Sequence, residues 1–234
     1  IDKGAAGCPE GACVEVDEIF YNTPARKKFM RSLATEMAYI TGSLERVILS
    51  RPDISFRVLH NRRILIQSPG GSVHDAALHL FGTSVAGALI PVHYSSSCVQ
   101  VEGVLSLPSL SRQNPYQIFI SINQRPVQSR ALAQSVRRGY GTLLPPDRFP
   151  CAILDIRIEP DRVDVNVHPT KREVRLHNEA EVRDSIAEAV ESALKGRDLT
   201  FVAKTPGRYP TQARIIPGHG SVEYAPDEKV PPGI

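Results

Sequence analysis

Lys171 is a residue whose type and place suggest chemistry. It belongs to VDVNVHPTKREVRL, residues 163–176, in which an alternating strand pattern ends at His168 and Pro169. A side chain mounted just beyond a strand end is held firmly enough to reach a neighbouring domain. Its ammonium is a compact point charge, which suits a phosphate.

From the residues alone, an ordinary solvated lysine on a loop is the favoured alternative. His168 has no nucleophile motif near it, so we expect it to be structural.

Arginines gather in a stretch that contains no acidic residue. Residues 103–146 have no Asp or Glu, although the net charge of the whole chain is only +3. The arginines of this stretch are Arg112, Arg125, Arg130, Arg137 and Arg138. A local field of one sign attracts polyanions even when a protein is nearly neutral overall. The pattern indicates contacts with DNA phosphates without base specificity, and an ordinary solvated surface is the alternative.

The spacing in residues 129–140 predicts a helix that Ser129 caps. Arg130 and Arg137 are nearly two turns apart, so they share one face with Gln134. The apolar residues Leu132, Val136 and Tyr140 fall on the opposite face. We therefore expect the helix to pack through its apolar face and to point its arginines outward. A second basic cluster, residues 26–31, fits a solvated helix face better than a site.

Composition limits the class of protein. The chain has 234 residues, of which 41% are hydrophobic, and this suits one large domain or two small ones. No apolar run approaches the 18 residues that a membrane helix needs. Its four cysteines lack the spacing of a zinc site, so we expect free, buried thiols in a reducing cytoplasm and no metal. The chain begins at Ile1 and reads as a piece of a longer protein.

Periodicity and cap residues predict alternating helices and strands, which indicate an α/β or α+β fold. A break at residues 69–71 and a Pro- and Gly-rich tail from residue 197 divide the chain. The helices are expected at 25–32, from Thr35 to about 51, at 72–81, 129–140 and 179–195. The strands are expected at 13–20, at 54–67 as a pair, and at 98–107, 116–123, 151–158 and 163–167. The strand at 151–158 is almost continuously apolar at its start, so it is expected at the centre of the sheet.

Three stretches resemble the MutL family of DNA mismatch repair ATPases. They are VEVDEIFYNTPARKKF (14–29), FISINQRPVQSR (119–130) and DVNVHPTKREVR (164–175). The resemblance covers about residues 10–196. It implies that residues 1–68 are the C-terminal part of an ATPase domain of the gyrase, heat-shock chaperone, histidine kinase and MutL superfamily. It also implies a transducer domain at 72–196, similar to the second domain of a ribosomal protein, and a flexible linker at 197–234.

The resemblance assigns roles to several residues. The lysine that matches Lys171 reaches the γ-phosphate of ATP, and the arginine that matches Arg130 is linked to DNA binding, with Arg125 in the same motif. We extend the DNA site to Arg137 and Arg138. ATP and Mg²⁺ are the expected cofactors. The family's catalytic Glu and magnesium-binding Asn precede Ile1, so we expect no hydrolysis by this piece alone. Ala12 stands where the family usually has Thr, which puts one nucleotide contact in doubt.

The resemblance also implies a role in the cell. The complete protein is expected to couple ATP-driven dimerisation to DNA binding and to signalling toward repair enzymes. Its expected partners are DNA, a second copy or a MutL-like subunit, mismatch-recognition proteins and downstream repair proteins, without a membrane. It is expected in the cytoplasm on the nucleoid of a prokaryote, or in the nucleus of a eukaryote. Two alternatives remain: a standalone nucleic-acid-binding module without ATP linkage, and the transducer of a gyrase-type topoisomerase.

Overall fold

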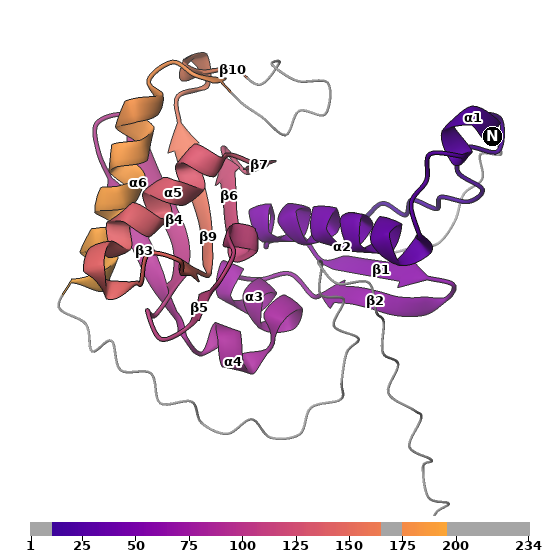
Figure 1. Cartoon of the computed structure of the whole chain (residues 1–234), viewed down its shortest axis with the longest axis horizontal. Coiled ribbons are helices and arrows are strands. Elements are labelled where there is room, and N and C mark those ends of the chain that lie inside the picture. Colours follow the sequence, from indigo (N-terminus) through magenta and orange to yellow (C-terminus); the bar gives the residue numbers. More distant parts are fainter. Residues whose placement is uncertain (1–10, 165–174, 196–234) are drawn as a thin grey trace, which may run out of the picture. The chain divides into compact units, whose positions relative to one another are not determined.

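The computed structural model describes residues 11–164 and 175–195, which form two compact units. The first unit contains the described residues up to Ile40, and the second contains those from Thr41 onward. Figure 1 shows the elements of both. The predicted boundaries at 68 and 72 stay a prediction, although in the second unit residues on both sides of the 69–71 break share one apolar cluster.

The first unit contains α1 (Pro24–Lys27) and the beginning of α2 (Leu33–Ser50). The prediction of a strand at 13–20 is wrong: residues 12–17 have no regular structure and turns follow them. A strand needs a partner for its backbone groups, and residues 11–40 contain no other strand. Val14 and Val16 are consequently 84% and 72% exposed. The short basic helix predicted at 25–32 is confirmed only over Pro24–Lys27, and the residues of 25–32 are exposed.

The cap of α2 lies three residues before Thr35, the predicted cap. The helix begins at Leu33, and the Ser32 hydroxyl, not Thr35, accepts the capping hydrogen bond, from the Thr35 backbone N–H at 3.3 Å. Serine is among the best residues for that position because its oxygen satisfies a helix N–H that has no partner within the helix. The predicted end near residue 51 is confirmed.

A five-stranded sheet forms the centre of the second unit. Its order is β3 (Leu89–Ser95), β4 (Val99–Ser106), β9 (Ala152–Ile158), β6 (Ile118–Ile122) and β7 (Arg125–Val127). Only β6 and β9 run parallel; the other neighbours in this sheet are antiparallel. The predicted α/β character and the central place of the 151–158 strand are therefore confirmed. Strand β3 was not predicted, because Pro91 interrupts its pattern; at the edge of a sheet a proline is tolerated.

Two helices cover one face of this sheet, as Figure 1 shows: α5 (Arg130–Tyr140) and α6 (Glu179–Leu194). The residues predicted to face inward on α5, Leu132, Val136 and Tyr140, are buried, and so are Val182, Ile186, Val190 and Leu194 on α6. They join β-strand residues such as Ile120 and Leu154 in the larger apolar cluster. The outward direction predicted for the α5 arginines is confirmed for Arg130 and Arg138, which are exposed, whereas Arg137 is half-buried.

A second apolar cluster lies on the other face of the sheet. Here Phe119 and Ile153 pack with Ile48 and Leu49 at the end of α2 and with Ala77. The elements that complete this layer are β1 (Phe56–His60), β2 (Arg63–Ser68), α3 (Val73–Phe81) and α4 (Thr83–Ala86). The predicted strand pair is confirmed as a hairpin. The helix predicted at 72–81 is also confirmed, and Ser72 caps it in a reciprocal capping box with Asp75.

Short elements complete the unit. Strands β5 (Ser111–Arg112) and β8 (Phe149–Pro150) pair with each other, as do β10 (Val163–Asp164) and β11 (Arg175–Leu176). Three 3₁₀ turns occupy Pro115–Gln117, Gly141–Leu143 and Pro160–Arg162. Only the first two residues of the predicted 163–167 strand are described, and the predicted linker at 197–234 lies outside the described residues.

Two expectations from composition concern the described residues. Cys151 is buried, and burial raises the pKa of its thiol to about 12, whereas Cys13 is exposed, so the prediction of buried thiols fails there. Every helix in the described part of the chain is too short or too polar to cross a bilayer.

Gly139 sets how closely α5 approaches α6, and we predict that it tolerates no side chain. A β-carbon there would lie 2.6 Å from both the Ala187 carbonyl oxygen and the Val190 β-carbon. Gly139→Ala should lower the free energy of unfolding by about 1–3 kcal/mol, because the helices must move apart. Urea denaturation measures this change. The matched control is Gly42→Ala in α2, whose new methyl would meet only the end of the Arg46 side chain, at 3.5 Å. Equal effects of the two substitutions would contradict the packing account.

Candidate nucleic-acid interface

Arg125 is the first residue of β7 and follows a tight turn. Asn123 and Gln124 form that turn with φ values of 50° and 63°, which fits a two-residue hairpin between β6 and β7. The Arg125 side chain is exposed and makes no hydrogen bond or ion pair with another described residue. Its guanidinium is therefore available to an anion.

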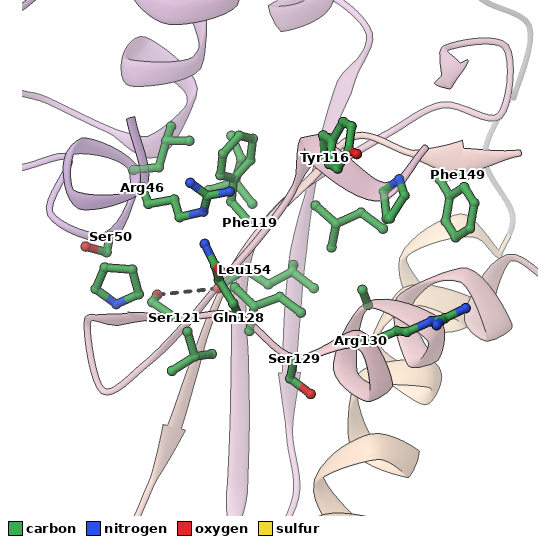
Figure 2. Close-up of a pocket in the computed structure, with 18 of the residues that line it drawn as sticks. Arg46, Ser50, Tyr116, Phe119, Ser121, Gln128, Ser129, Arg130, Phe149 and Leu154 are labelled. Carbon is green, nitrogen blue, oxygen red and sulfur yellow. Dashed lines mark hydrogen bonds between the residues drawn. The ribbon is translucent and has the colours of Figure 1, made fainter. Parts of the chain in front are cut away.

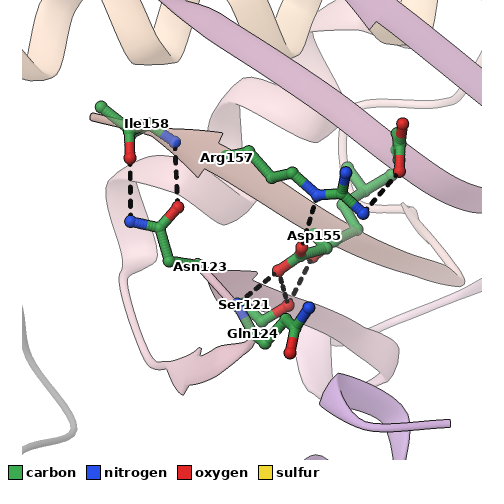
Figure 3. Close-up of polar contacts among 8 residues, drawn as sticks. Ser121, Asn123, Gln124, Asp155, Arg157 and Ile158 are labelled. Atoms are coloured by element: carbon green, nitrogen blue, oxygen red, sulfur yellow. Dashed lines mark hydrogen bonds and ion pairs between the residues drawn. The ribbon is translucent and has the colours of Figure 1, made fainter. Parts of the chain in front are cut away.

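The turn that carries Arg125 is tied to the end of β9 (Figure 3). The Asn123 side-chain amide donates to the Ile158 carbonyl at 2.9 Å and accepts from the Ile158 N–H at 3.0 Å. One carboxylate oxygen of Asp155 accepts from the Ser121 hydroxyl at 2.6 Å and from the Gln124 N–H at 2.9 Å. A turn held by four such bonds gives Arg125 a fixed base.

Arg130 is the first residue of α5. Ser129 caps this helix, as predicted, because its hydroxyl accepts from the Leu132 N–H at 3.3 Å. The Ser129 hydroxyl oxygen is therefore occupied by a hydrogen bond within the helix. Arg130 is exposed and, like Arg125, has no hydrogen-bonding or ionic partner among the described residues. The structure thus brings two unpaired arginines together at the β7–α5 connection, only five residues apart in the chain.

Arg137 and Arg138 differ from this pair because each already has partners. The Arg137 guanidinium donates to the carbonyl oxygens of Arg148, at 3.3 Å, and Pro145, at 3.0 Å, and the side chain is half-buried. Arg138 forms an ion pair with Asp184 on α6 and also donates to the Arg183 carbonyl. The Arg137 contacts stabilise the loop after α5, and the Arg138 contacts stabilise the packing of α5 on α6. Both arginines therefore have a structural role in addition to any contact with DNA.

A groove of about 610 Å³ opens beside Arg130 within the second unit (Figure 2). The end of α2 contributes Arg46 and Ser50, the segment around β6 contributes Tyr116 and Phe119, and the β7–α5 connection contributes Gln128 to Arg130. Among the described residues, Arg46 and Arg130 are the only charged ones that line it. Sequence reasoning missed this groove, because its walls come from segments about 70 residues apart.

Lys171, the predicted γ-phosphate contact, lies outside the described residues. Its predicted role therefore stays a prediction. The described ends of that segment, Val163–Asp164 and Arg175–Leu176, pair as antiparallel strands. Ala12 is described, and it is exposed without regular structure.

Comparisons with known proteins identify the family. The family described as "DNA mismatch repair protein, C-terminal domain" matches residues 77–195. The DNA mismatch repair protein MutL of Methanoculleus marisnigri is 43% identical over 228 residues, covering 92% of this chain and 39% of that protein. MutL of Methanocorpusculum labreanum is 42% identical over 208 residues, covering 88% and 35%. This chain belongs to the MutL family of DNA mismatch repair proteins. It spans less than half the length of these MutL relatives.

Solved structures agree on the fold of this MutL chain. The N-terminal domain of a DNA repair protein matches with a TM-score of 0.59 and 22% identity, over 74% of this chain and 58% of that one. A mutant of the Aquifex aeolicus MutL ATPase domain matches with a TM-score of 0.53 and 19% identity, over 74% and 59%. At such low identity these likenesses bear on the fold alone. The predicted fold class is confirmed.

The Asn123 tie to β9 leads to a test of stability. Asn123→Gly removes both side-chain bonds to Ile158, each worth a net 0.5–1.5 kcal/mol in general, so the free energy of unfolding should fall by about 1–3 kcal/mol. Asn123→Ala should cost about 1 kcal/mol more, because alanine is strained at a positive φ that glycine adopts freely. Urea denaturation of both variants separates the two effects. A glycine variant as stable as the original protein would show that the side chain does not secure the turn.

Proposed function

We propose that this MutL chain contacts the phosphates of DNA through Arg125 and Arg130, and that the complete protein links this contact to ATP. The observation that supports the proposal most directly is the pair of exposed arginines without described partners at the β7–α5 connection. Charge-assisted hydrogen bonds from arginine to phosphate are strong, and the planar guanidinium can engage two oxygens at once. Arginines without an internal partner offer all their donors to such a ligand.

The surroundings of the pair favour an anion without favouring any one base sequence. Residues 103–146 contain no acid that would compete for the arginines. The Asp155 carboxylate, which contacts the turn, already accepts bonds from Ser121 and Gln124 and lies 3.7 Å from Arg157. Phosphate contacts position a protein on DNA and carry no sequence information directly. We therefore propose binding that is insensitive to sequence.

Arg137 and Arg138 belong to the proposed interface as weaker contributors. An ion pair with Asp184 already offsets part of the Arg138 charge, and Arg137 donates to two backbone carbonyls. A phosphate must compete with these partners. We propose that Arg137 and Arg138 add to the positive electrostatic field of the surface, and that Arg125 and Arg130 make the closest contacts with the DNA phosphates.

ATP and Mg²⁺ enter the proposal through the complete protein. Lys171 would supply a positive charge to the γ-phosphate and would thereby sense whether that phosphate is present. The described residues contain no group of three or more His, Cys, Asp or Glu that could hold a metal, so we derive no step through magnesium from this chain. We further propose that ATP drives dimerisation with a second copy or a MutL-like subunit, and that mismatch-recognition and downstream repair proteins bind the closed form.

Membership in the MutL family decides against the gyrase-type topoisomerase. A standalone nucleic-acid-binding module without ATP linkage shares the same interface, so the alternatives differ only in the role of Lys171. In either case we place the protein with DNA, on the nucleoid of a prokaryote or in the nucleus of a eukaryote.

DNA affinity measured at several salt concentrations tests the arginine contacts. Arg130→Ala should reduce the slope of log K against log salt by about one, because one phosphate contact is lost. Arg130→Glu should weaken binding further, and on every sequence alike, because repulsion replaces attraction. Arg138→Ala is the matched control on the same helix and should change the slope less, because Asp184 already pairs with Arg138. Unchanged affinity and slope in both Arg130 variants would mean that this arginine is merely solvated.

The link to ATP is tested in the complete protein with Lys171→Ala. Loss of a phosphate-directed charge typically removes about 2–4 kcal/mol of transition-state stabilisation, so ATP turnover or ATP-dependent closure should slow markedly while the fold stays intact. Steady-state ATPase assays and crosslinking of the dimer measure the two effects. Lys195→Ala, which removes an exposed lysine paired with Glu191, is the control. Normal turnover and closure in Lys171→Ala would favour the standalone module.

A further inference from the structure

We propose that the groove beside Arg130 takes one unpaired base of single-stranded DNA, which stacks on the ring of Tyr116. This inference rests on the proposed DNA contact of Arg130 and adds to it a ligand and a site. The groove's volume of about 610 Å³ falls within the range of about 300–1,000 Å³ that is usual for small-molecule sites. A nucleotide is a ligand of that class.

The charge of the groove matches an anionic ligand. The described residues that line it include two arginines, Arg46 and Arg130, and no acidic residue. Arg46 donates to the Gly42 carbonyl at 2.6 Å and interacts electrostatically with Glu45, so only part of its charge acts on the groove. Arg130 has its donors available and stands at the rim, on the first turn of α5, as Figure 2 shows. A strand whose phosphate meets Arg130 would hold its base beside the opening.

Tyr116 supplies an aromatic face for that base. It lies in the 3₁₀ turn before β6, where Asn114 caps the turn by accepting from the Tyr116 N–H at 3.2 Å. The residue is 63% exposed, and it lines the groove. A base that stacks on an exposed aromatic ring typically gains about 1–3 kcal/mol, whichever base it is. Sequence-independent capture follows from this tolerance.

Two glutamines offer bonds to the edge of a base. Gln128 and Gln134 line the groove, are exposed, and have no hydrogen-bonding partner among the described residues. An amide carries both donors and an acceptor, so it can bond to any of the four bases. Ser121 and Ser129 also line the groove, but their hydroxyls already bond to Asp155 and to the Leu132 N–H.

The groove predicts a preference between DNA forms. A base inside a duplex is stacked and paired, so it reaches a protein pocket only after it leaves the helix. A single strand presents its bases without that cost. Phosphate contacts at Arg125 and Arg130 serve both forms, whereas stacking on Tyr116 adds affinity for the single strand alone.

The test uses the whole chain, an oligothymidylate of about 20 nucleotides, and a duplex of the same length. Tyr116→Ala should weaken binding of the single strand roughly five- to a hundredfold, in line with one lost stacking contact. Duplex binding should change less than twofold, and the salt slope should stay the same, because no phosphate contact is lost. Tyr116→Phe keeps the ring and should restore the affinity. Tyr21→Ala removes another exposed tyrosine, which does not line the groove, and serves as the control.

Each outcome supports or overturns the inference. A loss of single-strand affinity that Phe restores, at constant salt slope, supports it. Unchanged single-strand affinity in Tyr116→Ala overturns it, as does an equal loss for single strand and duplex. Arg130→Ala, measured alongside, reports separately on the proposed function. If Arg130→Ala reduces the salt slope while Tyr116→Ala has no effect on affinity, the base site in the groove is rejected and the phosphate contact of Arg130 is supported. Thermal melting followed by circular dichroism checks the fold of Tyr116→Ala, and an unfolded variant is replaced by Tyr116→Leu, which must give the same loss.

Discussion

The parallel pairing of β6 with β9 is the constraint on which the interface depends. Antiparallel strands can be joined by two residues, but a parallel pair needs a longer connection. Here β7 returns the chain antiparallel to β6, and the connection from β7 to β9 leaves the edge of the sheet after Val127 and contains α5, which begins at Arg130. Ser129 and Gly139 fit this path, the first as the cap of α5 and the second at its close approach to α6. The position of Arg130 therefore depends on the path of the chain between strands and on the cap of α5. The Arg130 side chain contributes little to that position.

Polar contacts divide the arginines of the acid-free stretch into two kinds. Asn123 and Asp155 are used to fasten the β6–β7 turn, and neither pairs with Arg125. Arg137 and Arg138 stabilise the loop after α5 and the α5–α6 pair. Arg125 and Arg130 remain without described partners on rigid backbone. A folded chain usually satisfies its buried polar groups and leaves exposed charges to solvent. Two solvated arginines on adjoining fixed elements make a suitable surface for phosphates.

Much of the second unit could be predicted from the sequence because its signals are local. The caps at Ser72 and Ser129, the apolar stripe of 179–195 and the apolar run at 151–158 all act within a few residues. The features that the sequence did not predict depend on residues that are distant in the chain. The alternation in 13–20 finds no second strand in residues 11–40, the described part of its unit. Pro91 interrupts the pattern of β3, an edge strand in which a proline is tolerated. The partners of Arg137 and Arg138, such as Asp184, and the groove beside Arg130 arise from contacts between distant segments, which no spacing rule reveals. The resemblance to the MutL family, which rests on three motifs, is confirmed.

Hydrogen exchange followed by mass spectrometry, with and without a single-stranded oligonucleotide, tests the central claim that DNA meets the β7–α5 connection. Backbone amides that become protected on binding report where structure is stabilised. The account predicts slower exchange in peptides that cover residues 115–134, and unchanged exchange in β3 and in the second half of α6. Protection confined to the basic cluster at residues 26–31, with residues 115–134 unaffected, would contradict it.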